Sequence, residues 1–273
     1  MFKARILSSI MAIAILFFVG FSGKEVLSVA VSIIALMGLK ELYNSFSYRG
    51  YKPIKFLGYI TCFFLLLLGF VGRSNTVFLC INTNAILLLV FLFVFAFLSM
   101  LVFLHSKYNI VDLSLSIIGI FYIPFMLSFI ILTRDLERGF YYFWLLPIGA
   151  WSTDTMAYFI GTRFGKTKLI PSISPNKTLE GFIGGVFGCV VFTFLYGYFM
   201  AEKCHIGLSY FVLLGFLNGL ISQFGDWVAS AIKRYLEVKD YGNIIPGHGG
   251  IMDRFDSLLF IAPIVYFYVV LVI

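Results

Sequence analysis

The chain has 273 residues, of which 61% are hydrophobic, 19% aromatic and only 12% charged. Soluble globular proteins carry about 25% charged residues, so this composition excludes an ordinary cytosolic enzyme, a disordered chain and a disulfide scaffold. It indicates an all-α polytopic integral membrane protein. The net charge of +7 is typical of Lys and Arg beside a cytoplasmic leaflet, and we expect no nucleic-acid partner. Four cysteines without CxxC spacing are interpreted as small core residues: Cys62, Cys80, Cys189 and Cys204.

Nine apolar runs without charge follow one another along the chain. We interpret the first as an uncleaved span, because Gly20, Phe21 and Ser22 offer no clear small-x-small cleavage site. The second and third runs are short, and a re-entrant pair is an alternative interpretation of them. The runs are 6–22, 26–39, 56–71, 80–104, 113–132, 140–161, 181–200, 207–227 and 257–273.

The Lys and Arg residues predict the orientation. With the N-terminus in the cytoplasm, 15 of the 20 fall on the cytoplasmic side, which obeys the positive-inside rule. An eight- or ten-span count would break this alternation. We therefore expect about nine transmembrane helices in a multi-pass protein of the cell inner (cytoplasmic) membrane, with the N-terminus cytoplasmic and the C-terminus outside. The five residues on the outer side are Lys24, Arg73, Arg134, Arg138 and Lys203.

The charge pattern divides the chain near residue 150. Residues 1–150 carry their charges singly at the ends of spans one to five and are predicted to be generic membrane helices. Residues 151–273 carry clustered charges, and we expect them to form the catalytic part, with spans six to nine and cytoplasmic site loops. No repeat of 20–50 residues is found, which argues against a transporter built from two inverted halves.

The densest charge cluster lies between residues 226 and 256, which hold nine of the chain's 33 charged residues. A solvated basic loop would explain the Lys and Arg there, but not the acids among them. Asp226 ends an apolar run, where a carboxylate is costly unless it faces a polar cavity, a partner or a metal. If the eighth span continues as a helix, five polar residues share one stripe: Asp226, Ser230, Lys233, Arg234 and Glu237.

A glycine-rich loop, Pro246-Gly-His-Gly-Gly250, follows this stripe. Glycines let backbone N–H groups approach a ligand closely. Asp253 and Asp256 come next and share a face if a helix starts there. Such hard oxygen ligands suit Mg²⁺, and no His/Cys set with zinc spacing is present.

A second polar stretch covers residues 151–181. It includes Asp154 inside an apolar run, for which a lone buried acid paired with a nearby base is the alternative interpretation. On the seventh span, four glycines form two interlocked GxxxG spacings, which predict close helix packing and also permit a homodimer. They are Gly181, Gly184, Gly185 and Gly188.

Residues 230–240 and 246–256 together resemble the signature of the bacterial phosphatidate cytidylyltransferases (CDP-diacylglycerol synthases). That signature reads S-x-x-K-R, then K-D-x-G, then HGG-x-x-D-R-x-D, and every fixed position is matched here. Residues 174–181 and Asp154 are similar to the family's upstream motif. The resemblance covers 151–256, whereas residues 1–150 match only as generic spans.

The resemblance implies that CTP and phosphatidate react to give CDP-diacylglycerol and pyrophosphate for phospholipid synthesis. It implies a cytoplasmic active site in contact with membrane lipids, a requirement for Mg²⁺, and room for a second metal ion. The implied metal ligands are Asp226, Asp253, Asp256 and Asp154. The implied catalytic residues are Lys233, Arg234, Lys239, Asp240, His248 and Arg254. The implied substrate-binding residues are Ser174, Lys177, Ser230, Gly249 and Gly250.

Two other classes of protein put polar groups on a membrane bundle. A CTP-dependent polyprenol or phytol kinase would transfer the γ-phosphate, and the full HGG-x-x-D-R-x-D string argues against it. An ion or solute transporter would use Asp154 and Asp226 as relay acids. The charge cluster lies at the predicted cytoplasmic face instead of the bilayer midplane, which disfavours the transporter.

Overall fold

The computed structural model of the protein describes residues 2–70, 83–244 and 249–273. Within these ranges the chain is helical, and its single β-type pairing is an isolated bridge between Lys168 and Thr178. Long helices are expected of apolar runs, since in a bilayer each backbone N–H must bond within its own segment. The helices are α1 (Phe2–Phe21), α2 (Lys24–Tyr48), α3 (Lys55–Phe70), α5 (Thr83–Phe103), α6 (Ile110–Ile120), the π-helix η1 (Phe121–Phe125), α7 (Met126–Arg134), α8 (Gly139–Phe164), α9 (Leu179–Cys204), α10 (Leu208–Leu236) and α11 (Met252–Val272).

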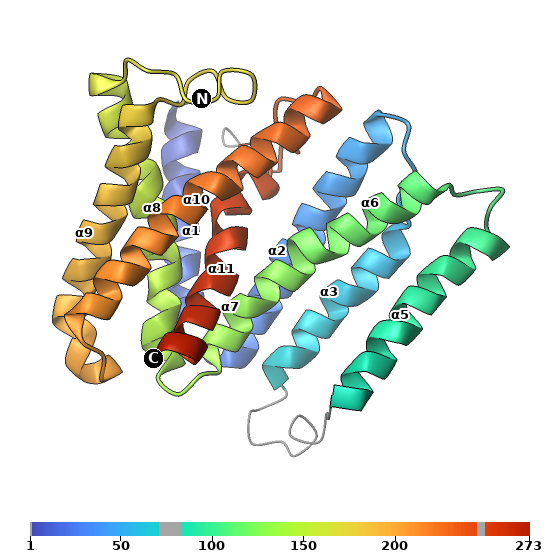
Figure 1. Ribbon diagram of the computed structural model, residues 1–273, viewed down its shortest axis with the longest axis horizontal. Helices are drawn as coiled ribbons and strands as arrows, with labels where there is room; N and C mark the ends of the chain where they lie inside the picture. The colour runs from blue at the N-terminus through green and yellow to red at the C-terminus, as the bar shows by residue number, and fades with distance from the viewer. Residues whose placement is uncertain (1, 71–82, 245–248) are drawn as a thin grey trace.

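Successive rods of the bundle run in opposite directions between its two ends, with the N-terminus at one end and the C-terminus at the other (Figure 1). Each predicted apolar run overlaps one of these rods. Five are long and apolar enough to cross a membrane: α2, the continuous α6–α7 rod, α9, α10 and α11. The prediction of an all-helical chain with membrane-spanning helices is confirmed for the described residues. The count of nine spans and their orientation stay predictions.

The second predicted run extends well past its expected end. α2 is a continuous helix of 25 residues instead of a short re-entrant segment. The charged pair Lys40 and Glu41 ended the apolar run but not the helix, because both residue types favour helical backbone. The turn of α2 that carries Glu41 is therefore ordered and packed inside the bundle.

The rod formed by α6 and α7 is interrupted at Pro124, which lies in the π-helical turn η1. A proline inside a helix removes one backbone hydrogen bond, and a π-turn is a common way to absorb this defect. Tyr122 and Ile123 of this turn are buried. The π-turn thus keeps α6 and α7 in one continuous rod.

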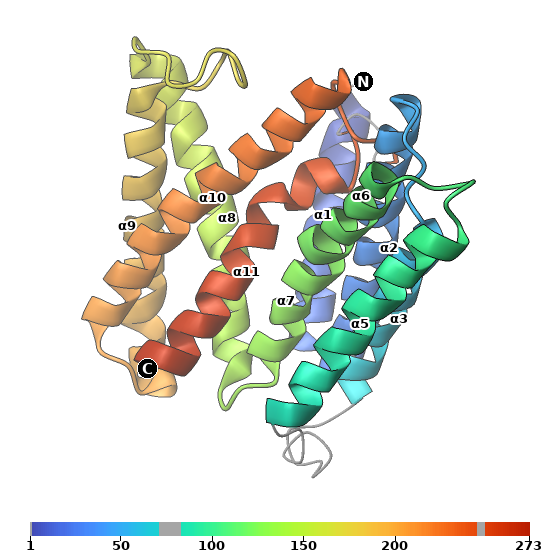
Figure 2. The ribbon, with the colours of Figure 1, turned by 45° about the vertical axis from the view of Figure 1, so that its right-hand side comes forward.

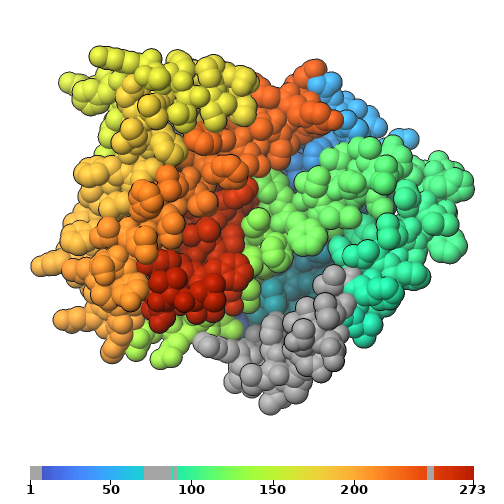
Figure 3. Space-filling model, in the orientation of Figure 1, coloured from blue at the N-terminus to red at the C-terminus, as the bar shows by residue number. Residues whose placement is uncertain are grey.

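Two groups of helices pack around a shared middle. α8, α9, α10 and α11 pack successively against one another, while α2 packs along α3, and α7 and α11 join the two groups. Figure 2 shows α3, α5 and α6 on one side of the molecule and α8, α9 and α10 on the other. The surface is hollowed between α7 and α5, with α3 at the bottom of the hollow (Figure 3).

The glycines of α9 face α8, as the GxxxG spacing predicted. A Cβ added to Gly181 would lie 2.9 Å from the carbonyl oxygen of Ala157, and one added to Gly188 would lie 2.2 Å from Cγ of Met156. Glycine therefore permits the close approach of these two helices. The spacing is used inside the chain, and the homodimer stays a prediction.

Candidate active site

The segment between α8 and α9 folds back on itself, and this places Lys177. The backbone N–H of Leu179 donates to the carbonyl oxygen of Thr167 at 2.9 Å. Thr178 is the N-cap of α9, and its hydroxyl oxygen accepts a 3.2 Å hydrogen bond from the N–H of Gly181. Such a cap satisfies one of the free N–H groups at a helix start. Lys177 is thereby held at the entrance of α9.

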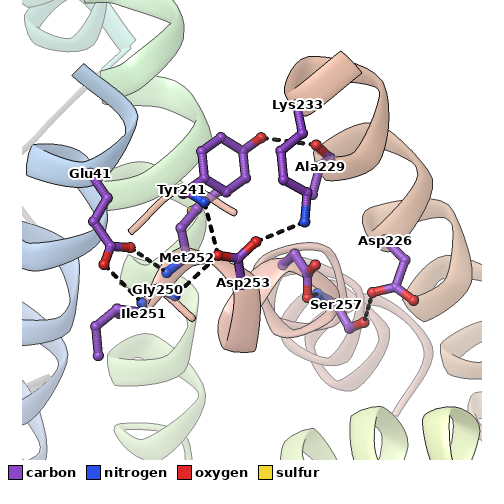
Figure 4. A network of polar contacts seen from close by, with 11 residues as sticks. Glu41, Asp226, Ala229, Lys233, Tyr241, Gly250, Ile251, Met252, Asp253 and Ser257 are labelled. Carbon is purple, nitrogen blue, oxygen red and sulfur yellow. Dashed lines mark hydrogen bonds and ion pairs between the residues drawn. The ribbon is translucent and has the colours of Figure 1, made fainter. Parts of the chain in front are cut away.

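Both carboxylate oxygens of Asp226 are engaged. Nζ of Lys177 lies 2.6 Å from Oδ2. The hydroxyl of Ser257 donates to Oδ1 at 2.9 Å, as Figure 4 shows. The preceding residue of α10, Gly225, allows this contact with α11. A Cβ at that position would lie 2.7 Å from the carbonyl oxygen of Asp256. Close approach of the two helices therefore brings Ser257 to Asp226.

Three acids from three different helices lie near enough to interact electrostatically. Asp154 of α8 interacts electrostatically with Asp226 of α10, and Asp256 of α11 interacts with both. Like charges in a poorly solvated site repel strongly, so this arrangement favours the arrival of cations. Three cations also interact electrostatically with these acids: Lys177 and Arg254 with Asp154, and Lys233 with Asp256.

Asp253 belongs to a separate network, drawn in Figure 4. Nζ of Lys233 lies 2.7 Å from Oδ1, and the backbone N–H groups of Tyr241 and Gly250 donate to Oδ2 at 2.9 Å and 3.1 Å. The Asp253 side chain is only 4% exposed. Burial raises the pKa of the Tyr241 phenol above its ordinary value, so this group stays protonated and donates to the carbonyl oxygen of Ala229 at 3.0 Å. The network joins α10, the loop after it and the start of α11.

Glu41 of α2 caps α11 from the other half of the chain (Figure 4). Its two carboxylate oxygens accept hydrogen bonds from the backbone N–H groups of Ile251 at 3.1 Å and Met252 at 2.9 Å. Glu41 is 4% exposed, and Ile251, the N-cap residue of α11, provides no side-chain cap of its own. A carboxylate at a helix N-terminus satisfies free N–H groups and complements the helix dipole. Glu41 thus fixes the start of the helix that carries Asp253.

A cavity of about 530 Å³ opens beside Asp226, between α8, α9, α10 and the segment 165–178. Asp154 and Lys177 also line it. One wall is aromatic, because the rings of Phe182 and Trp227 stack with centroids 5.5 Å apart. The cavity therefore combines carboxylates, an ammonium group and a flat apolar wall, which suits a phosphorylated ligand with a less polar part.

The polar stripe predicted on the eighth span forms, because α10 continues as a helix to Leu236. It ends one residue before the last member of the stripe, since Glu237 is the C-cap residue with φ of 56°. Nε of Arg234 donates to the carbonyl oxygen of Ile173 at 3.1 Å, which ties the end of α10 to the segment before α9. Ser230 lies half-buried on the same helix.

Several predicted site residues do not take part in the contacts described above. Ser174 is half-buried in the segment before α9, and Lys239 and Asp240 are exposed on the loop after α10. Gly249 has a φ of +85°, a left-handed conformation that favours glycine, and a Cβ there would face Asp253 and Asp240. His248 lies outside the described residues.

Four acids of this region were predicted to bind Mg²⁺. Among the residues that the structure describes, no three His, Cys, Asp or Glu side chains are grouped so that they could hold a metal ion together. The carboxylates of Asp154, Asp226 and Asp256 interact electrostatically, and their oxygen atoms are the hard ligands that Mg²⁺ prefers. Asp253 fits a metal less well, because three N–H donors already surround its carboxylate. Metal ligation stays a prediction for all four acids.

Sequence reasoning missed Glu41, Tyr241, Ser257 and Trp227. The signal for Glu41 was present, since it is an acid inside a long, mostly apolar helix, the same argument that singled out Asp226. The hydroxyl of Ser257 and the indole of Trp227 in apolar runs, and the phenol of Tyr241 in a loop, carry no comparable signal. Their roles follow only from which helices meet.

Comparisons with known proteins agree on one family. A sequence model described as the cytidylyltransferase family matches residues 3–272. A phosphatidate cytidylyltransferase of Bacillus subtilis (strain 168) is 34% identical over 266 residues, covering 97% of this chain and 96% of the relative. One of Staphylococcus aureus (strain COL) is 34% identical over 267 residues, covering 96% of each chain. The match includes residues 1–150, for which the sequence motifs gave only generic spans.

Proposed function

The chain belongs to the cytidylyltransferase family, and on this premise we propose that it transfers the cytidylyl group of CTP to phosphatidate, giving CDP-diacylglycerol and pyrophosphate. The observation that carries the proposal is the cavity beside Asp226. Lys177, Asp154 of α8 and Asp226 of α10 line it at the end of an apolar helix bundle, and Asp256 of α11 interacts electrostatically with both acids. A lipid can enter such a site from the bilayer while a nucleotide enters from water.

The reaction forms one bond and breaks one. A phosphate oxygen of phosphatidate attacks the α-phosphorus of CTP, the bond from this phosphorus to the bridging oxygen breaks, and pyrophosphate carries away the electron pair. Phosphoryl-group chemistry of this type depends on positioning and on neutralising charge, and no covalent nucleophile is required of the protein.

Lys177 is the residue that we assign to the lipid phosphate. Its ammonium group lines the cavity and is paired with Asp226 at 2.6 Å. An arriving phosphate dianion offers it a second acceptor with greater charge, and the position of Lys177 at the start of α9 is fixed by the folded segment behind it. Lys233, Arg234 and Arg254 then remain to neutralise the nucleotide phosphates.

We assign the Mg²⁺ ligands to Asp226, Asp154 and Asp256. Mg²⁺ held there would neutralise charge that develops on the leaving pyrophosphate. This assignment is supported by the carboxylate oxygens of the three acids and by the electrostatic repulsion between their charges. For Asp253 we assign a different task, which is to orient Lys233 and the loop backbone at Tyr241 and Gly250.

The proposed placement is the inner membrane, with nine spans and the site at the cytoplasmic end. It is supported by the 15 Lys and Arg residues that alternating spans would gather on one side. The segments 165–178, 237–244 and 249–251 lie at the same end of the bundle as the start of α1 (Figure 1). CTP would therefore reach the site from the cytoplasm.

The test is transfer of a labelled group by the purified protein in lipid nanodiscs. With phosphatidate, Mg²⁺ and CTP labelled with ³²P at the α-phosphate, label should enter the lipid phase, with one pyrophosphate released per lipid labelled. Label from the γ-phosphate appearing in a lipid alcohol would instead identify a CTP-dependent kinase. Solute flux without transfer of either label would identify a transporter.

A further inference from the structure

A second concave site lies away from the cavity beside Asp226. It is a groove of about 790 Å³ between the α2–α3 connection and the α5–α6 connection. Three lysines line this lysine groove: Lys52, Lys55 and Lys107. No Asp or Glu is among its described lining residues, and it shares no lining residue with the cavity beside Asp226. The groove is therefore a separate patch of positive charge.

The walls of the lysine groove are built on α6. The backbone N–H of Lys52 donates to Oδ1 of Asp112 at 2.6 Å, and the N–H of Ile54 donates to the hydroxyl of Ser116 at 2.7 Å. Asp112 also forms a reciprocal capping box with Asn109 at the start of α6. Asp112 is 3% exposed, so its charge is buried behind the groove. These contacts fix the groove before any ligand arrives.

The lining matches a phospholipid head and the upper part of its chains. Lys52 and Lys107 are exposed, and Nζ of Lys55 lies 2.9 Å from Oδ1 of Asn44. Tyr108 lines the groove as well, and Phe56 at its edge is 71% exposed on α3. Lysine beside aromatic rings is the usual arrangement at a membrane interface facing anionic lipid. The positive-inside rule explains the sign of these charges, but not their collection around a fixed hollow.

The lysine groove is also connected to the helix that carries the active-site residues. The phenol oxygen of Tyr51, which lines the groove, lies 2.6 Å from that of Tyr235 near the end of α10. Arg49 donates to the carbonyl oxygen of Tyr235 at 3.1 Å and forms an ion pair with Glu237. A ligand that orders the α2–α3 connection would therefore also steady the last turn of α10, which holds Lys233 and Arg234.

We propose that the lysine groove binds the anionic phosphodiester head of a membrane phospholipid that is not the reacting substrate, and that its occupation supports the ordered end of α10. Vesicle composition would then influence turnover through a site distinct from the catalytic cavity.

Binding can be measured by native mass spectrometry of the full-length, delipidated protein titrated with phosphatidylglycerol or phosphatidylcholine. The test variant is Lys52→Gln/Lys55→Gln/Lys107→Gln. We expect the wild type to bind one more phosphatidylglycerol than this variant, or to bind it with about tenfold higher affinity or more. Phosphatidylcholine should bind both equally.

The matched control removes three exposed cations outside the groove: Lys40→Gln/Arg163→Gln/Lys166→Gln. It should bind phosphatidylglycerol like the wild type. If the triple groove variant does not fold, as judged by its thermal unfolding midpoint, Lys107→Gln alone should still weaken binding. Equal binding by groove and control variants would overturn the proposal. Displacement of the lipid by equimolar inorganic phosphate would also overturn it, because the site would then recognise free phosphate.

Discussion

Glu41 and Met252 lie 211 residues apart in the chain, yet a carboxylate oxygen of Glu41 accepts a 2.9 Å hydrogen bond from the backbone N–H of Met252. The contact joins α2 to the first residue of α11. Because Asp253 and Asp256 follow at once, their positions depend on a helix from the N-terminal half. Residues 1–150 thus contribute directly to the candidate site.

Glu41→Gln should lower both turnover and thermal stability. The amide keeps one acceptor oxygen, but its NH₂ group would face the second N–H of α11. A hydrogen bond to a charged group contributes about 1.5–3 kcal/mol to stability. Because this bond fixes the start of the helix that carries Asp253, we expect turnover to fall by about tenfold or more. Turnover and the thermal unfolding midpoint should be measured in the same detergent. Glu25→Gln, exposed at the start of the same helix, is the control, and equal losses in both variants would contradict the capping role.

Lys233→Ala should abolish turnover and destabilise the protein, because it leaves the carboxylate of Asp253 buried without its partner. Breaking a buried ion pair in this way costs about 3–5 kcal/mol. The double variant Lys233→Met/Asp253→Asn should recover much of the thermal stability but no turnover, since the ammonium group that Lys233 offers to the phosphates is still missing. Recovery of turnover in the double variant would mean that Lys233 only neutralises Asp253. Arg234→Ala, whose side chain is exposed, should lower turnover strongly with little change in thermal stability.

Asp226→Asn and Asp256→Asn should raise the Mg²⁺ concentration for half-maximal turnover by about tenfold or more, because an amide lacks the charge that a hard cation requires. Excess Mg²⁺ or Mn²⁺ should partly restore turnover. Asp253→Asn should lose turnover at every Mg²⁺ concentration, since its contacts are with Lys233 and backbone N–H groups. Glu202→Gln, which neutralises an exposed acid, serves as the control. An unchanged Mg²⁺ requirement in Asp226→Asn and Asp256→Asn would assign those acids to ion pairing alone.

Lys177→Gln should raise the KM for phosphatidate by about tenfold, because one charge-assisted hydrogen bond to the lipid phosphate is lost. The KM for CTP should change much less. Lys166→Gln, an exposed lysine of the same segment, is the matched control. A larger change in the KM for CTP than for phosphatidate would place the nucleotide, and not the lipid, at Lys177.

Cysteine labelling in intact cells tests the orientation. Ser172→Cys and Asn243→Cys lie at the end of the bundle proposed to be cytoplasmic, and Glu202→Cys lies near the opposite end of α9; all three positions are exposed. A membrane-impermeant maleimide should label only Glu202→Cys until the cells are opened. Labelling of Ser172→Cys from outside would exclude the nine-span arrangement. A Cys80→Ser background lowers the signal from native thiols, since the other three cysteines are buried: Cys62, Cys189 and Cys204.

The sequence by itself determined the helical membrane class and the stretches that carry chemistry. Apolar runs and acids inside them are local signals, because a helix in a bilayer satisfies its own backbone and a buried carboxylate is costly wherever it occurs. The continuation of α10 beyond the apolar run also follows from the local pattern of polar residues. The motif from Ser230 to Asp256 pointed to the family that the whole chain matches.

Only the tertiary structure decided which of these groups meet. The family resemblance implied that Asp226 and Asp253 both hold metal, yet Asp226 pairs with Lys177 and Ser257, while Asp253 pairs with Lys233. These partners are set by where helices cross, and the crossing of α10 and α11 depends on the missing side chain of Gly225. Helical periodicity fixes the face on which a residue lies but not the helix that this face will contact, because contacts between distant segments depend on the packing of the whole bundle.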